Sequence, residues 1–329
     1  MLPIRLRRVN GHEGRENDVL FHPARQKPPM PETLVYFGGD VQDYEEVMQT
    51  HRDNRNYVKW SLENTARMLS ENFPTKHIVV VRPARIEYKS FSCYDNFVPS
   101  NNAGVPDHTP THHALHHLEK LLQELSIRVK ELPTRQLTDA VMCGLYADDD
   151  VDIEEQGASN NENKSKSNGA AKCDAAAGTS LEHKQSPLWW RDTLTLDKSK
   201  LSLVGFSKGC VVLNQLIYEF HYTKTLTPWD RHMCSNRAAC ACACACADVR
   251  VHVHVSPYQV ADAARPWIGR EERAFTSLLH KLGAKIDRYL HDDSTSPHSL
   301  NTHFEVLSNF KAVQDSRPGD MHDASEDDT

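Results

Sequence analysis

Hydrophobic residues occur along this chain in short runs that alternate with helically spaced apolar positions. Leu34 to Phe37 is an apolar run that stops at Gly38. Ile78 to Val81 is a continuous β-branched run, which is typical of a buried parallel strand. Between them, helically spaced apolar residues begin after Ser61, a residue type suited to a helix N-cap. The pattern therefore predicts a strand, a helix and a second strand in this order.

The same alternation continues toward the C-terminus. We predict a helix at about 112–127, a strand at 201–204, a helix from 210 to about 222, a strand at 249–255, a helix at about 267–282 and a strand at 284–290. Strands that alternate with helices indicate a mostly parallel sheet with helices on both faces. We therefore expect one α/β domain over residues 34–310.

Three segments lack a core-forming pattern. Residues 1–33 begin with a basic, partly apolar stretch, and we expect a disordered or targeting segment there. Residues 147–187 contain almost no large apolar side chain, which predicts a low-complexity insertion. Residues 311–329 end in an acidic sequence that is typical of a disordered tail.

Composition excludes two classes of protein. No apolar stretch approaches the roughly 18 residues that a membrane-spanning helix needs, so we expect no membrane span. The net charge of −7 argues against nucleic-acid binding, because phosphate groups are neutralised by clustered Lys and Arg. Four of the nine cysteines alternate with alanine at 240–246, where neighbours two apart cannot form ordinary disulfides with one another.

The most informative motif is the pentapeptide Gly205-Phe206-Ser207-Lys208-Gly209. A predicted strand enters it and a predicted helix leaves it, which is the context of a nucleophile elbow. In such an elbow the serine lies on a sharp turn, and glycines stand where a side chain would collide with the neighbouring strand and helix. Ser207 is therefore the predicted catalytic nucleophile.

A serine nucleophile in this fold is followed along the chain by an acid and then a histidine, each after a strand. Asp262 follows the predicted strand 249–255, and His303 lies in the loop expected after strand 284–290. We expect His303 to take the proton from Ser207 and Asp262 to orient the imidazole. Other residues in range for these roles are Asp230, Asp248, Asp287, His291 and His298.

An oxyanion hole needs two backbone N–H groups near the nucleophile. One is expected from Lys208, directly after Ser207, and the other from the loop after the first strand, at Gly39 or Asp40. Glycine would let the backbone approach the oxyanion closely, although a Gly-Gly pair is equally typical of a simple turn.

Several segments together resemble a known family. They are LVYFGGDVQDY, WSLEN, FSCYDNFV, LVGFSKGCVVLNQL, VHVHVSPYQVAD and PWIGREE. These segments make the chain similar to the mitochondrial α/β-hydrolase-like family of chromosome two open reading frame sixty-nine. The resemblance covers most of 34–127 and 200–304, and leaves the N-terminal stretch, the insertion and the tail without a counterpart. It implies an α/β-hydrolase-like fold, a mitochondrial location and a serine-hydrolase site at Ser207, with no established substrate.

The chain departs from that family at residues 225–248. Family members carry a further strand and helix there, whereas this chain has an Ala-Cys repeat. A parallel crossover needs a dozen or more residues, so we expect an irregular segment and a sheet that lacks one strand-helix unit.

Three functions remain open from the sequence. The first is a serine hydrolase that acts on an ester, thioester or amide, with a small or acylated substrate and no cofactor. The second is an inactive hydrolase-like scaffold that serves a mitochondrial protein partner. The third is a metal-dependent hydrolase, which would need His112, His116, His252 and His254 to converge.

Overall fold

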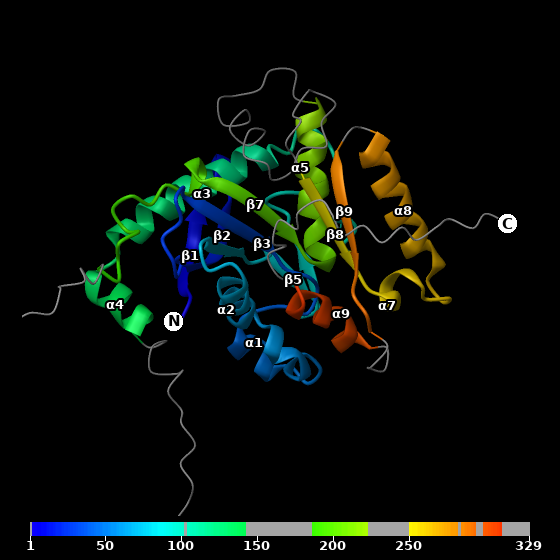
Figure 1. The fold of residues 1–329 in the computed structure, drawn as a ribbon, viewed down its shortest axis with the longest axis horizontal. Coiled ribbons are helices and arrows are strands. Elements are labelled where there is room, and N and C mark those ends of the chain that lie inside the picture. Colours follow the sequence, from blue (N-terminus) through cyan, green and yellow to red (C-terminus); the bar gives the residue numbers. More distant parts are fainter. Residues whose placement is uncertain are drawn as a thin grey trace, which may run out of the picture.

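The computed structural model describes residues 2–101, 104–142, 186–222, 250–281, 284–293 and 299–310 (Figure 1). Most of the expected insertion at 147–187 lies outside these residues. So do the segment 225–248 and the tail at 311–329, and the expectations for these three segments stay predictions.

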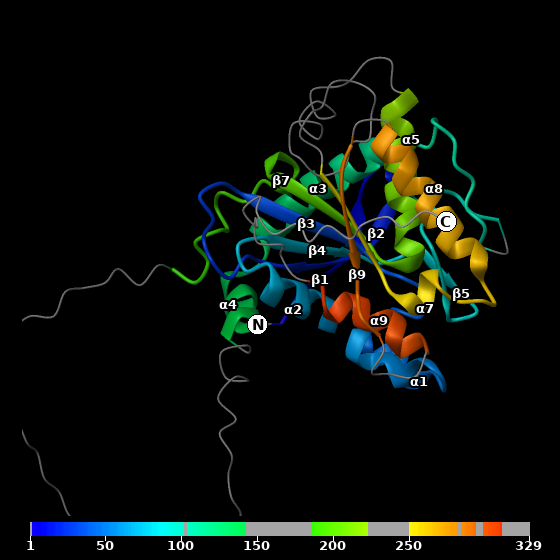
Figure 2. The ribbon, with the colours of Figure 1, turned by 45° about the vertical axis from the view of Figure 1, so that its right-hand side comes forward.

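A five-stranded mixed sheet forms the centre of the molecule, with the order β1-β2-β4-β3-β7 (Figure 2). The strands are β1 (Ile4–Asn10), β2 (Glu16–His22), β3 (Glu32–Phe37), β4 (His77–Val81) and β7 (Lys200–Gly205). Strand β3 is parallel to both β4 and β7, as the buried apolar runs predict. Strand β2 is antiparallel to both of its neighbours, so the sheet is less parallel than expected.

Of the two alternatives expected for residues 1–33, disorder was wrong, and a targeting role stays a prediction. Strands β1 and β2 form a hairpin, and β2 joins the sheet at β4. Ile4 and Leu6 are buried, and so are Val19 and Phe21. The alternation of apolar residues in β1 is interrupted by arginines at solvent-facing positions, so the strand resembles a basic targeting segment in sequence.

Helices cover both faces of the sheet, as predicted. Val35, Phe37, Val79 and Val81 face one hydrophobic cluster, which also holds the buried side of α3 (Ala114–Glu131) and α5 (Cys210–Tyr222). The alternate positions Leu34, Tyr36, Ile78 and Val80 face a second cluster with α2 (Leu62–Asn72) and α9 (Leu300–Ser308). Ser61 caps α2 by accepting a hydrogen bond from the Asn64 N–H, at 3.2 Å. Smaller elements in these regions are α1 (Glu45–Thr50), η2 (Asn54–Trp60), β5 (Arg85–Glu87), β6 (Phe91–Cys93) and α4 (Thr134–Met142).

The remaining strands form a separate parallel pair. Strand β8 (Arg250–Val255) pairs with β9 (Lys285–Leu290), and α7 (Pro257–Val260) and α8 (Pro266–Lys281) lie between them in the chain. Within the described residues, β7 pairs with β3 alone and β8 with β9 alone. Among these residues β7 is therefore an edge strand of the five-stranded sheet, and β8 and β9 form a sheet of their own.

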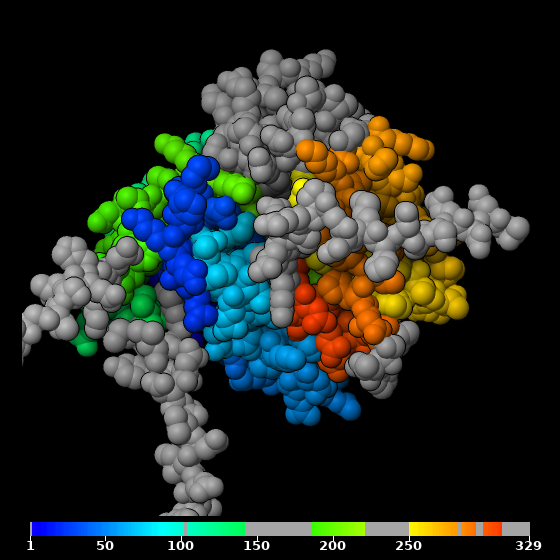
Figure 3. All heavy atoms as spheres, in the orientation of Figure 1, coloured from blue at the N-terminus to red at the C-terminus, as the bar shows by residue number. Residues whose placement is uncertain are grey.

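Helix α9 brings the C-terminal part of the chain against its first third. Trp60 stacks on Phe304 with ring centroids 5.0 Å apart, and Trp60 Nε1 donates a hydrogen bond to Ser308 Oγ at 3.0 Å. Figure 3 shows α9 against the surface of α1 and α2, and Figures 1 and 2 both place α9 beside α1. His303 therefore lies in a helix, and its expected place in a loop was wrong. The capping box at Ser299, which starts this helix, was missed in the sequence.

Within the described ranges, no helix is both long enough and apolar enough to cross a bilayer.

Candidate functional site

Ser207 stands on a sharp turn between a strand and a helix. Strand β7 ends at Gly205, a short 3-10 turn, η4, spans Ser207–Gly209, and α5 begins at Cys210. The φ angle of Ser207 is +52°, in the left-handed region that a residue with a side chain seldom adopts. The side chain is exposed. The turn thus presents a strained serine at the carboxyl end of a parallel strand.

The two motif glycines lie where a side chain cannot fit. A Cβ atom on Gly209 would overlap the carbonyl group of Phe37 in β3. A Cβ atom on Gly205 would lie 2.9 Å from the Cα atom of Cys210 at the start of α5. The turn is therefore packed backbone to backbone against β3 and α5, and it fixes the position of Ser207.

The loop after β3 passes directly in front of Ser207. A Cβ atom on Gly39 would lie 2.9 Å from the Cβ atom of Ser207. Two residues on, Val41 has a φ angle of +73°, which is unfavourable for a β-branched side chain. Its N–H group donates a hydrogen bond to the Ser90 carbonyl oxygen at 2.6 Å. The loop is held in an unusual conformation next to the serine.

A buried glutamine, Gln42, holds this loop from inside. Its Oε1 atom accepts hydrogen bonds from the Gly39 N–H at 2.9 Å and from the Tyr36 hydroxyl at 2.8 Å. Its Nε2 atom donates to the Trp60 carbonyl oxygen at 2.8 Å and to Thr65 Oγ1 at 3.2 Å. The Gly39 N–H is therefore already bonded, and of the three expected oxyanion donors only Lys208 and Asp40 are left.

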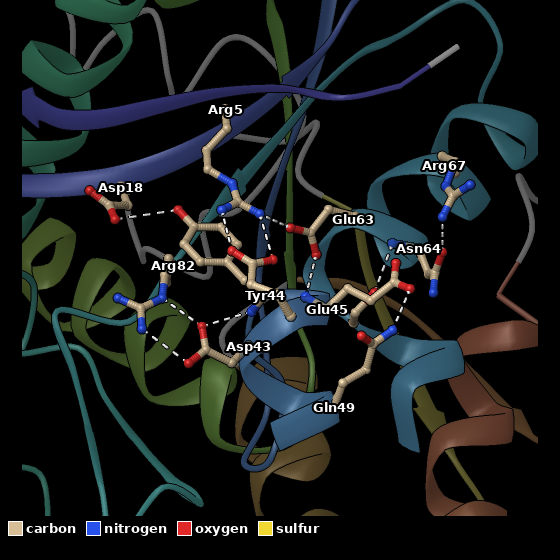
Figure 4. A network of polar contacts seen from close by, with 12 residues as sticks. Arg5, Asp18, Asp43, Tyr44, Glu45, Gln49, Glu63, Asn64, Arg67 and Arg82 are labelled. Atoms are coloured by element: carbon tan, nitrogen blue, oxygen red, sulfur yellow. Dashed lines mark hydrogen bonds and ion pairs between the residues drawn. The ribbon is translucent and has the colours of Figure 1, made fainter. Parts of the chain in front are cut away.

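An ionic network holds the other end of the loop (Figure 4). Asp43 accepts hydrogen bonds from Arg82 Nε at 2.6 Å and from a second guanidinium nitrogen at 3.0 Å. The ring of Tyr44 contacts two guanidinium groups, that of Arg5 at 3.6 Å and that of Arg82 at 5.0 Å from the ring centroid. The loop from Gly38 to Tyr44 is thus bonded at both ends to the body of the domain.

The side chain of Asp40 faces another loop. Its Oδ1 atom accepts a hydrogen bond from the Ser92 N–H at 2.8 Å, and the Ser92 hydroxyl donates to the Gly39 carbonyl oxygen at 2.8 Å. Burial raises the pKa of the Asp40 carboxyl group, while the Ser92 hydrogen bond and the nearby Lys208 ammonium group oppose that shift. Lys208 Nζ itself donates to the Gly104 carbonyl oxygen at 2.5 Å.

His303 reaches this region from α9. Its ring stacks on that of Phe206, the residue before Ser207, with centroids 4.6 Å apart. Burial lowers the pKa of His303 to about 4, and the charge of Arg265 lowers it further in the same direction. His303 Nδ1 is buried and has no hydrogen-bond partner, and within the described residues no hydrogen bond is formed by Ser207 Oγ.

Asp262 is hydrogen-bonded to Arg265. Its carboxylate accepts hydrogen bonds from Arg265 Nε at 2.7 Å and from the Ala264 N–H at 2.8 Å. Because His303 Nδ1 has no partner, the expected hydrogen bond from that nitrogen to Asp262 is absent from this structure. The structure thus gathers Gly39, Asp40, Lys208 and Ser207 and places His303 beside them, while Asp262 is paired with Arg265.

Two of the other candidate residues have partners elsewhere. Asp287 lies 3.6 Å from Arg250, and His291 Nε2 is 2.9 Å from His254 Nδ1. Asp230, Asp248 and His298 are outside the described residues.

The histidines considered for a metal site do not converge. His112 Nε2 is 2.7 Å from the Asp107 carbonyl oxygen near the start of α3, whereas His252 and His254 lie on β8. In the part of the chain that the structure describes, no three His, Cys, Asp or Glu side chains gather as metal ligands would.

Sequence reasoning missed Gln42, Ser92 and Arg265. Gln42 stands within the quoted segment LVYFGGDVQDY, but a buried amide that bonds four groups has no sequence signature of its own. Arg265 lies only three residues after Asp262, but these residues were not part of a predicted helix, so the sequence did not indicate their ion pair.

Comparison with known proteins agrees with the resemblance in the sequence. The C2orf69 family model matches residues 5–240 and 242–285, so the N-terminal stretch, expected to lack a counterpart, has one. The mouse mitochondrial protein C2orf69 homolog is 36% identical over 318 residues, which cover 90% of this chain and 83% of the mouse protein. The human mitochondrial protein C2orf69 is 32% identical over 321 residues, with 91% and 80% coverage. The crystal structure of a thermostable esterase aligns with a TM-score of 0.37 and 7% identity, over 93% of this chain and 60% of the esterase. The chain belongs to the C2orf69 family of mitochondrial proteins.

Proposed function

We propose that the protein is a serine hydrolase that cleaves an ester, thioester or amide, with Ser207 as its nucleophile. The observation that carries this proposal is the exposed Ser207 at φ +52° between a parallel strand and a helix. An elbow of this kind in α/β hydrolases lifts the nucleophile above the carboxyl edge of the sheet. The strand order β1-β2-β4-β3-β7, with β2 alone reversed, is that of the first half of an α/β-hydrolase sheet and supports the same assignment.

The proposed reaction uses groups on three elements. Ser207 Oγ attacks the substrate carbonyl carbon while His303 takes the hydroxyl proton, and the resulting oxyanion accepts hydrogen bonds from the backbone N–H groups of Lys208 and Asp40. The leaving alcohol, thiol or amine receives the proton from His303. Water then attacks the acyl group on Ser207 and transfers a proton to His303. The bond between the acyl carbon and Ser207 Oγ breaks, His303 returns the proton to Oγ, and the acid is released.

Neutral His303 is available as a base at pH 7 because its pKa is about 4. The same low pKa makes the imidazole a weak base in the ligand-free protein. Catalytic hydrogen bonds often form only when substrate binds, so the missing bond between Ser207 and His303 is compatible with this role. We assign Asp262 as the orienting acid only in a state where its carboxylate leaves Arg265.

Labelling of the full chain with a fluorophosphonate tests the proposal. We expect covalent labelling of the native protein and loss of the label in Ser207→Ala. Ser186→Ala changes an exposed serine before β7 and serves as the matched control, which should label as the native chain does. Label retained by the Ser207→Ala variant would exclude Ser207 as the nucleophile.

A second function is favoured by one specific observation. The buried Nδ1 atom of His303 has no partner and the Asp262 carboxylate is held by Arg265, as expected if turnover had been lost. The protein would then be a hydrolase-like scaffold for a mitochondrial protein partner. A folded native chain that takes up no fluorophosphonate would support this alternative over the hydrolase.

A further inference from the structure

A cavity lies at the amino ends of β3, β4 and β7, at the end of the sheet opposite Ser207. Its volume is about 150 Å³. Its lining includes Thr33, His77, Trp189, Trp190, Leu194 and Leu196, and Lys27 from the loop before β3. Four residue steps along β3, about 13 Å of strand, separate Thr33 at this cavity from Phe37 beside the Ser207 turn. The cavity is therefore distinct from the proposed active site.

His77 supplies a hydrogen-bond donor at this cavity. Its side chain is 95% buried, since its exposed fraction is 5%. Its Nδ1 atom accepts a hydrogen bond from the Ala24 N–H at 3.1 Å, so the ring proton lies on Nε2. Burial lowers the pKa of His77 to about 4, which keeps this tautomer neutral at pH 7. Within the described residues, the Nε2–H group has no acceptor.

The walls around this donor are aromatic and well packed. Trp190 contacts His77 edge to face at 6.3 Å and Phe21 at 5.6 Å between ring centroids, and Trp189 lies 6.4 Å from His77. Trp190 is 2% exposed, so its position is fixed by the core. Aromatic walls with one convergent polar group are typical of small-molecule sites.

The only charge among the described residues that line the cavity is positive. Lys27 is the one charged side chain among the described residues that line the cavity, and it is exposed. Lys76 and Lys200 lie nearby along the chain but contact Glu32 at 3.5 and 3.4 Å. Lys76 also donates a hydrogen bond to Ser202, a residue of β7 on the face of the sheet opposite the cavity. The cavity is therefore lined by the neutral His77 donor and by hydroxyl residues such as Thr33 and Ser199, with Lys27 as the one charged residue of the described lining.

We propose that this cavity binds a small aromatic carboxylate, with its ring against Trp189 and Trp190 and a carboxylate oxygen bonded to His77 Nε2–H. A volume of about 150 Å³ is enough to hold a molecule the size of benzene. Lys27 favours the anion over a neutral compound of equal shape. The proposal does not depend on hydrolysis at Ser207.

Fluorine NMR of the full chain with para-fluorobenzoate, and with neutral para-fluorobenzamide, tests this site. His77→Asn keeps an acceptor for the Ala24 N–H and removes the Nε2 donor, so we expect benzoate affinity to fall about tenfold. Lys27→Met should weaken benzoate about two- to fivefold and leave benzamide unchanged. Thr193→Trp, a change at an exposed lining position, should abolish binding of both compounds.

Two results would overturn the proposal. Absence of benzoate binding to the native chain would mean that the cavity holds water or another part of the chain. Binding that survives in Thr193→Trp would place the ligand elsewhere on the protein. If the His77→Asn variant fails to fold, benzoate binding to the Thr193→Trp and Lys27→Met variants still tests the site, because both changes are at exposed positions.

Discussion

Gln42 Oε1 accepts a hydrogen bond from the backbone N–H of Gly39 at 2.9 Å, and this bond joins a fully buried side chain to the loop in front of Ser207. The same amide bonds Tyr36, Trp60 and Thr65. The loop conformation, including the strained Val41, therefore depends on one side chain behind it.

Replacement of Gln42 by Ala should affect both stability and reactivity. It would leave the Gly39 N–H and the Tyr36 hydroxyl buried without this acceptor, which costs about 2–4 kcal/mol of unfolding free energy. Urea unfolding measures that loss, and the rate of fluorophosphonate labelling measures the effect on Ser207. Gln49→Ala removes an exposed glutamine of α1 and is the matched control. A Gln42→Ala variant that labels at the native rate would show that this loop does not act at Ser207.

Gly39 itself provides a sharper test of the loop's position. A methyl group there would lie 2.9 Å from Ser207 Cβ and 3.0 Å from a ring carbon of Phe206. We expect Gly39→Ala to lose most of its labelling while it loses only about 1–3 kcal/mol of stability.

A second glycine separates crowding at Ser207 from a general loss of stability. Gly14 has a φ angle of +73° and open space around its Cα atom. Gly14→Ala should therefore lower stability by about 1 kcal/mol through backbone strain alone and keep full labelling. Equal loss of label in Gly14→Ala and Gly39→Ala would argue against a specific contact between Gly39 and Ser207.

The features that the sequence predicted correctly have local causes. The parallel pair β3 and β4 follows from two buried apolar runs, and the start of α2 follows from a capping serine. The glycines around Ser207 stand where only glycine fits, so the motif itself predicts the conformation of the turn. In each case the signal lies in a short stretch of sequence, although the contact that it serves, such as that of Gly209 with Phe37, can join distant residues.

The features that were missed depend on distant contacts. Strand β1 is stabilised by pairing with β2 and by packing on the core, and its own sequence is half basic. The partner of Asp262 is set by competition between Arg265 and His303, which no spacing along the chain resolves. Gln42 acts through four groups that are brought together only in the folded protein.

The pairing of Asp262 with Arg265 makes a distinct prediction. In chymotrypsin-like triads, changing the acid to Asn costs about 10⁴-fold in rate. Since Asp262 does not contact His303 Nδ1 here, we expect Asp262→Asn to lower the labelling rate by less than about tenfold. A loss as large as that of Ser207→Ala would show that Asp262 orients His303 in the reactive state.

Removal of Arg265 should have the opposite effect on the site. Its positive charge contributes to the low pKa of His303, so Arg265→Met should raise that pKa from about 4 toward its ordinary value. The acid limb of the labelling rate against pH should then move to higher pH, and the rate at neutral pH should rise. Arg288→Met removes a half-exposed arginine of β9 that pairs with Glu272 of α8, and it is the control. An unchanged pH profile would contradict the electrostatic role of Arg265.

His117 makes the stability of the fold sensitive to acid. Its Nδ1 atom accepts a hydrogen bond from the His12 N–H at 3.1 Å, and Nε2 lies 2.8 Å from Asn17 Oδ1. A proton on His117 Nδ1 would face the His12 N–H group, so two hydrogen-bond donors would point at each other. Burial lowers the pKa of His117 to about 3, and the charges of Arg15 and His12 lower it by smaller amounts. The unfolded chain binds this proton below about pH 6.5, whereas the folded chain does so only near pH 3.

Folding stability should therefore fall as the pH is lowered from about 6.5 toward 3, by up to about 1.4 kcal/mol per pH unit from this one group. Between pH 7 and pH 5 the loss from His117 amounts to about 2 kcal/mol. Urea unfolding at several pH values measures it in the native chain and in His117→Gln, whose side chain does not titrate. We expect a shallower dependence in the variant over this window, and the same dependence as the native chain in His280→Gln, which changes an exposed histidine of α8. Parallel curves for the native chain and His117→Gln would show that His117 does not titrate differently in the two states.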